Sequence, residues 1–223
     1  MRIFGNFFIS ALIYLLLFLP TVSWAEDKGT AFIEISANIF SNGDFSSNAK
    51  KAILKKKPEA KNIEDNDHTG VAIRILAGGT LSAFNMRMNA AIDIGGSPTL
   101  DFTAKQYPWS DYHYSSQKFG NGLILRILLT ADYFIIGNAS DNTGLAFSTG
   151  FGYGGLLDAQ LGEDEYTDTV SYDGTSYEYG LKLVFPIADN TNLSLSLMKA
   201  QVLHSSEFSW KSNMITLGLN GRF

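Results

Sequence analysis

One short stretch of the 223-residue sequence, HSSEF, carries residue types that can perform hydrolysis. His204 and Ser206 are a base and a nucleophile two positions apart, and a hydrolase needs both groups in contact. A working site also needs a third group that orients the base. Beyond this stretch, the sequence offers no glutamate at a position suited to that role. Counting along the alternation that begins at Leu193 places His204 on the inner face of a strand. We therefore expect no enzyme activity.

A second stretch, GEDEYTDTVSYDG, is rich in carboxylates that could bind a divalent cation through oxygen ligands. Its acidic residues are Glu163, Asp164, Glu165, Asp168 and Asp173. Their spacing does not fit a twelve-residue calcium loop. A solvated acidic run explains them better, so we expect neither a bound metal nor a cofactor.

Two further stretches have the composition of binding surfaces. The first, KKAILKKKPEAK, contains Lys50, Lys51, Lys55, Lys56, Lys57 and Lys61. Such a cluster could bind phosphate groups of lipopolysaccharide or anionic polymers on a host cell. The alternative is a solvated loop or a short helix that ends before Pro58. The second stretch, YPWSDYHY, offers Trp109, Tyr112 and Tyr114 for binding, for packing of loops, or for contact with the outer leaflet.

The first 25 residues have the pattern of a secretory signal. Arg2 precedes a 13-residue apolar run at 7–19, and the small residues Ser23 and Ala25 follow it. Thirteen residues are too few for a membrane-spanning helix, which needs about 20. Without this segment, 26–223 forms one domain with 16 basic and 22 acidic residues, a net charge of −6. Nucleic acid is therefore not an expected partner. With no cysteine in the chain, no disulfide framework is expected.

The mature sequence alternates between apolar and polar residues with a period of two, the pattern of strands with two different faces. The pattern predicts strands at 32–40, 71–77, 84–94, 123–131, 145–155, 177–185, 193–202 and 215–223. Long connections at 41–69, 95–121 and 156–176, and a shorter one at 204–213, alternate with short turns. The strand number and the loop rhythm favour an all-β, eight-stranded antiparallel up-and-down transmembrane barrel over a soluble sandwich. Tyr153, Tyr177, Tyr179 and Phe223 fall near strand ends, where an aromatic girdle would lie.

The polar faces of these strands carry charges that would point into the barrel. They are Glu34, Arg74, Arg87, Asp93, Arg126, Glu178 and Lys182. An eight-stranded barrel is just wide enough to be filled by its own side chains, and buried charges must be paired. We expect a salt-bridged plug, in which Arg87 and Arg126 contact carboxylates. The alternative is a narrow, gated path for water or ions.

The last nine residues, ITLGLNGRF, resemble the C-terminal signature of bacterial outer-membrane barrels. Ile215, Leu217, Leu219 and Phe223 match its alternation and its final aromatic residue, whereas Gly221 stands where a bulkier residue is usual. The resemblance implies that the barrel-insertion machinery reads this segment. In layout, the mature chain resembles the small eight-stranded class that includes the OmpA transmembrane domain, OmpX and the opacity-type proteins.

That resemblance implies a multi-pass barrel in the bacterial outer membrane, surrounded by lipid and lipopolysaccharide. We expect the external loops to act in surface interaction (adhesion) or in envelope integrity. The first alternative is a narrow channel for small solutes or ions. The second is a lipid A-modifying hydrolase, because outer-membrane lipid A deacylases have a His-x-Ser pair with the spacing of His204 and Ser206.

Overall fold

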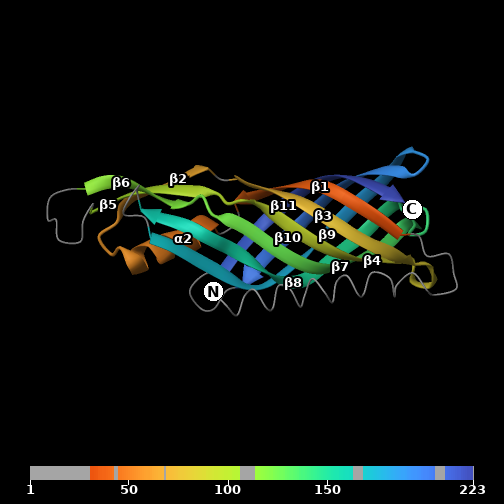
Figure 1. Ribbon diagram of the computed structural model, residues 1–223, viewed down its shortest axis with the longest axis horizontal. Coiled ribbons are helices and arrows are strands. Elements are labelled where there is room, and N and C mark those ends of the chain that lie inside the picture. Colours follow the sequence, from red (N-terminus) through yellow and green to blue (C-terminus); the bar gives the residue numbers. More distant parts are fainter. Residues whose placement is uncertain are drawn as a thin grey trace.

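The computed structural model describes residues 31–42, 45–67, 69–105, 114–162, 168–203 and 209–222. Eight antiparallel strands run up and down and close into a barrel (Figure 1). They are β1 (Ala31–Asn42), β3 (Thr69–Leu81), β4 (Met86–Gly96), β7 (Leu123–Asn138), β8 (Thr143–Gly162), β9 (Asp168–Ala188), β10 (Thr191–Leu203) and β11 (Ser209–Arg222). Each predicted strand overlaps one of them, so the eight-stranded fold expected from the sequence is confirmed. The predicted signal segment lies outside the described residues.

The barrel closes between its first and last strands. β1 pairs with β11 from Phe32, opposite Arg222, to Asn42, opposite Ser212. β1 also pairs with β3, and β8 pairs with both β7 and β9. Each of the eight strands therefore has two neighbours. Lipid requires such closure because an open edge would leave backbone groups without hydrogen bonds.

Side chains alternate between the outside and the inside of the barrel, apart from a few bulges. On the outside, Ile73 and Leu197 keep about three fifths of their surface exposed, at 60% and 62%. On the inside, Glu34 and Arg87 are buried, at 1% and 0% exposure. So large an exposed apolar surface belongs in lipid rather than in water. Among the described residues, no helix is long and apolar enough to cross a membrane.

The sheet extends beyond the barrel at the end where the long connections lie. β8 pairs with β7 as far as Leu157, and its outer end then pairs with β6 (Tyr114–Gly120). β5 (Thr99–Lys105) pairs with β6, and β2 (Lys61–Asp67) pairs with β5 at the edge. The connection expected at 156–176 is largely strand, because the outer ends of β8 and β9 continue their pairing there. By the convention for such barrels, this is the external end.

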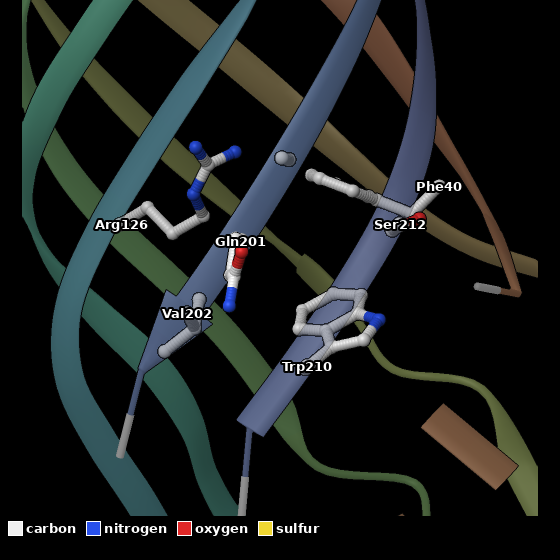
Figure 2. A pocket seen from close by; sticks show the side chains of 7 residues that line it. Phe40, Arg126, Gln201, Val202, Trp210 and Ser212 are labelled. Carbon is white, nitrogen blue, oxygen red and sulfur yellow. The ribbon is translucent and has the colours of Figure 1, made fainter. Parts of the chain in front are cut away.

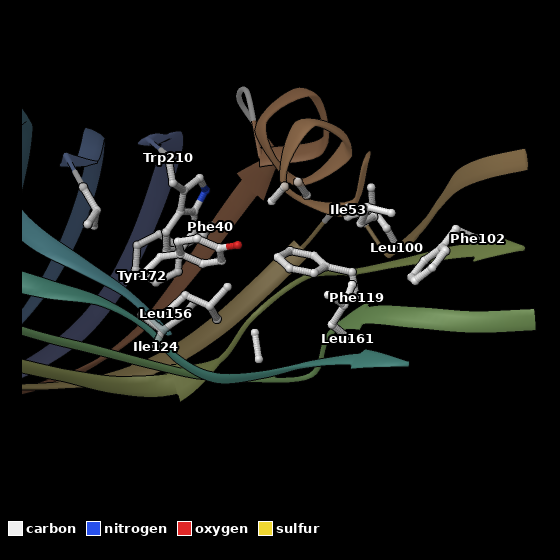
Figure 3. Close-up of a cluster of buried hydrophobic side chains, with 14 of the residues drawn as sticks. Phe40, Ile53, Leu100, Phe102, Phe119, Ile124, Leu156, Leu161, Tyr172 and Trp210 are labelled. Atoms are coloured by element: carbon white, nitrogen blue, oxygen red, sulfur yellow. The ribbon is translucent and has the colours of Figure 1, made fainter. Parts of the chain in front are cut away.

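A helix, α2 (Phe45–Lys56), packs against this extension and lies next to β11. Its Ala49, Ala52 and Ile53 recur at helical spacing and are buried. They join an apolar cluster that reaches Phe40 and Trp210 at the barrel mouth, where the two rings are 5.3 Å apart. Figure 3 shows this cluster running from the extension to the mouth. The helix, the extension and the barrel mouth therefore share one core.

The opposite, periplasmic end has short connections. A single 3-10 turn, η2 (Ser82–Phe84), joins β3 to β4. Asn85 ends it in the left-handed conformation, with φ of 49°, and its backbone N–H donates to the Ser82 carbonyl. Phe84, which the sequence pattern placed in a strand, therefore belongs to this turn and is exposed. Asparagine tolerates the left-handed conformation better than most residues, which explains why the turn ends here.

Candidate functional site

The barrel interior contains a layer of four charged side chains nearer its external end. Arg74 Nε and Nη2 donate to the Asp93 carboxylate at 2.6 and 2.9 Å, and Nη1 and Nη2 donate to Glu178 at 2.8 Å. Arg126 donates to Asp93 Oδ2 at 3.0 Å and to Glu178 Oε2 at 2.7 Å. Asn38 and Ser176 contribute further hydrogen bonds. Two guanidinium groups thus neutralise two carboxylates. We call these four residues the upper layer.

Four more charged side chains form a second layer nearer the periplasmic end. Arg87 is paired with Asp132, and Lys182 Nζ donates to Glu34 Oε2 at 2.7 Å. Lys182 Nζ also lies 3.6 Å from Asp132 Oδ2, which links the two pairs. The Arg87 guanidinium lies 4.3 Å from the centre of the Phe32 ring and 5.4 Å from that of Phe134. This lower layer is also neutral and fully buried.

Glycines of β8 make room for the upper layer. Arg126 stands opposite Gly154 and reaches across β8 to Ser176 and Glu178 on β9. A Cβ atom added to Gly154 would lie only 2.6 Å from the Arg126 Cγ atom. At Gly150, an added Cβ would lie 3.0 Å from the Glu178 Cγ atom. Glycine at these inward-facing positions of β8 therefore serves interior packing.

As expected from the sequence, Arg87 and Arg126 contact carboxylates. The sequence pattern predicts four basic and three acidic residues in the interior and leaves out Asp132, which balances the charge. The predicted strand ended at residue 131, although the inward series through Arg126, Leu128 and Thr130 continues to Asp132. Extending the period-two pattern by one residue would have found it.

Above the upper layer, the barrel mouth is packed with apolar and aromatic side chains. Figure 2 shows the ring of Trp210 beside Ser212 and the guanidinium of Arg126 across from them. The hollow between these groups has no room for a water molecule. It is lined by Phe40, Arg126, Ala200, Gln201, Val202, Trp210 and Ser212. Conduction along the axis would require this packing and both charged layers to rearrange.

The basic cluster found in the sequence lies mainly on α2. Lys51, Lys55 and Lys56 are exposed, and Lys50 is half-buried. Lys57 follows the helix and donates to the Gln117 side chain of β6. Lysines in the last turn favour the helix because its carboxyl end has a partial negative charge. The structure thus places a basic surface on a helix that is anchored to the external extension.

Several residues singled out in the sequence fall elsewhere. Outside the described residues lie Trp109, Tyr112, His204, Ser206, Phe223 and the acidic run 163–165. Tyr114 begins β6. Asp173 accepts a hydrogen bond from the Tyr153 hydroxyl. Ile215, Leu217 and Leu219 point outward from β11 and are about half exposed. Among the described residues, no group of three or more potential metal-binding side chains comes together.

A closed eight-stranded meander with an apolar outer face and a charge-paired interior defines a small outer-membrane β-barrel protein. No protein-family model and no curated protein matches the sequence. Among solved structures, the chain is similar to Ail, the attachment invasion locus protein of Yersinia pestis. The TM-score is 0.51 at 12% identity, over 87% of this chain and 99% of that one.

Two other outer-membrane proteins show the same layout at lower similarity. For Neisserial surface protein A, the TM-score is 0.46 at 12% identity, over 86% of this chain and 97% of that one. For the N-terminal β-barrel domain of Pseudomonas aeruginosa OprF, the TM-score is 0.44 at 13% identity, over 87% and 97%. At these identities, the likeness concerns the fold alone.

Proposed function

We propose that this barrel is a non-enzymatic surface protein that binds polyanions through the lysines of α2. The observation that carries the proposal is that Lys50, Lys51 and Lys56 belong to one helix, which the burial of Ala52 and Ile53 holds in place. Of these lysines, Lys51 lies on the face opposite the buried residues. A fixed helix holds the charges close together, so less conformational freedom is lost on binding than from a mobile loop. The ligand class is a sulfated or phosphorylated polymer, on a host cell or on the bacterial surface.

The basic surface acts locally. The mature chain has a net charge of −6, so its overall field repels anions. At physiological ionic strength, screening limits electrostatic attraction to about 8 Å. A polyanion that contacts α2 is therefore attracted by the nearby lysines more than it is repelled by distant carboxylates. Binding should weaken with salt, since the screening length falls to about 3 Å at 1 M.

The filled interior supports this proposal over a narrow channel. Two neutral charged layers and a packed mouth occupy the axis, and opening a path would separate buried ion pairs that compensate each other. The alternative of a lipid A-modifying hydrolase depends on His204 and Ser206. Incubating lipid A with the wild type and with Ser206→Ala tests it directly, and we expect no release of fatty acid in either case.

The test of polyanion binding uses heparin and sucrose octasulfate as probes. Ail has been crystallised with the latter, a heparin analogue. The protein, refolded in uncharged detergent, should bind both probes, and Lys50→Gln/Lys51→Gln/Lys56→Gln should bind them much more weakly. As a control, Lys118→Gln removes an exposed charge from β6 and should bind both probes like the wild type. Equal, salt-insensitive binding by all variants would refute the proposal and leave the aromatic stretch around Trp109 as the better candidate.

A further inference from the structure

Two lysines point outward from the barrel wall near its external end. Lys199 in β10 and Lys211 in β11 are both exposed. Directly below Lys199 on β10 lies Leu197, and Ile215 of β11 stands opposite Leu197, below Asn213 and Lys211. Leu197 and Ile215 belong to the apolar belt and are 62% and 47% exposed. The lysines therefore mark the level at which the wall changes from apolar to polar. In an outer-membrane barrel, this level faces the headgroups of the outer leaflet.

The strand register brings the two lysines together. Lys199 stands opposite Asn213 of β11, and Lys211 stands opposite Gln201 of β10. Lys199 and Lys211 are therefore diagonal neighbours on the same face, with backbones about 7–8 Å apart. Their long, flexible side chains can run along the apolar wall and bring both ammonium groups to one anion.

The surroundings of the lysines fit an anionic headgroup. On its other side, Lys199 stands opposite Tyr179 of β9, a residue that is 46% exposed. Tyr177, one step further out, donates its hydroxyl hydrogen to the Gln201 side chain. In the described pairing, Lys199 stands between Tyr179 and Asn213, and Lys211 stands opposite Gln201; these three residues are uncharged. The patch thus combines two positive charges with a phenol donor above an apolar wall.

We propose that Lys199 and Lys211, with the Tyr179 hydroxyl, bind a phosphate group of a phosphorylated glycolipid, the lipid A portion of lipopolysaccharide. Its acyl chains would lie against Leu197 and Ile215. An anion in this position gains both charge neutralisation and apolar contact, which a soluble anion cannot do. The site is separate from the lysines of α2, and it does not depend on the function proposed for them.

The test compares lipid binding by variants of the full-length mature protein, refolded in uncharged detergent and followed by native mass spectrometry. The probes are bisphosphorylated lipid A, the same lipid without phosphates, phosphatidylglycerol and inorganic phosphate. Each lysine near a charged membrane surface contributes roughly a fivefold change in affinity. Lys199→Gln/Lys211→Gln should therefore bind bisphosphorylated lipid A roughly thirtyfold more weakly than the wild type. Both proteins should bind the dephosphorylated lipid equally weakly.

Control variants distinguish this site from the basic surface of α2. Lys50→Gln/Lys51→Gln on α2 should bind lipid A like the wild type, whether or not it still binds heparin. Tyr179→Phe should weaken lipid A binding by a smaller factor. Each variant is checked for the folded band on unheated gels. Three results would each overturn the proposal. They are unchanged lipid A binding by Lys199→Gln/Lys211→Gln, wild-type affinity for phosphatidylglycerol equal to that for lipid A, and displacement of lipid A by millimolar phosphate.

Discussion

Replacing Glu178 with glutamine should strongly destabilise the barrel without changing its shape. The carboxylate is buried, at 2% exposure, and accepts hydrogen bonds from Arg74 at 2.8 Å and from Arg126 at 2.7 Å. Glutamine has nearly the same volume but no charge. The upper layer would then hold two guanidinium groups against Asp93 alone, leaving one buried positive charge unbalanced.

The expected cost follows from this imbalance. Removing one partner of a buried ion pair costs about 3–5 kcal/mol, which is roughly a hundred- to several-thousand-fold in the folding equilibrium. Urea-induced unfolding in lipid vesicles, followed by tryptophan fluorescence and by gel mobility, measures it. The midpoint should fall while the dependence of the unfolding free energy on urea stays unchanged.

Two double variants test whether the layers act as units. Glu178→Gln combined with Arg126→Gln removes a neutral pair, so its cost should be smaller than the sum of the two single costs by about 0.5–3 kcal/mol. Glu178→Gln combined with Asp132→Asn affects both layers. Asp132 on β7 and Glu178 on β9 are two strands apart and offset by two residues, since Asp132 stands opposite Ser148 and Ser148 opposite Gly180. Their backbones are therefore about 12 Å apart, so these costs should add within about 0.5 kcal/mol. A loss below about 1 kcal/mol for Glu178→Gln, or additivity within the upper layer, would refute the reasoning.

Three further predictions concern the interior, the C-terminus and the packing of β8. Conductance in planar bilayers should be small or absent because charged layers and apolar side chains fill the barrel; steady, large openings of the wild type would contradict this. Deleting Phe223 should lower the amount of protein in outer-membrane fractions and leave precursor to periplasmic proteases. Unchanged amounts on immunoblots would mean that the insertion machinery does not recognise the final aromatic residue. Gly154→Ala should destabilise the barrel by about 1–3 kcal/mol in urea titrations, since its Cβ would collide with Arg126. Gly96→Ala, whose Cβ would have no atom within 4 Å, should be nearly neutral, and equal effects of the two changes would count against the packing interpretation.

The positions of the strands and the face on which each side chain lies could be predicted from the sequence, because side chains in a strand alternate with a period of two. The pattern located all eight strands and assigned Glu34, Arg74 and Lys182 to the inner face, where the structure buries them. It was less reliable at strand ends. Phe84 continues the apolar alternation, yet it lies in a turn, because a left-handed Asn85 reverses the chain there.

Register decides which charges become neighbours on adjacent strands, and one strand's pattern does not contain it. Asp93 stands opposite both Arg74 and Arg126, and Arg87 stands opposite Asp132, because β3, β4 and β7 pair in one particular alignment. A shift of a single residue would turn these side chains toward lipid. The sequence therefore predicted that the interior arginines meet carboxylates, but not which ones.

Closure of the barrel decides the remaining contacts. Arg74 of β3 binds Glu178 of β9, and Lys182 of β9 binds Glu34 of β1. In the closed ring, β9 is separated from each of these partner strands by at least two others, so the contacts form across the lumen. The sequence determined which faces carry charge, since alternation is a local property. Only the tertiary structure decided how the charges sort into two neutral layers, because that sorting depends on distances between strands that are remote in the chain.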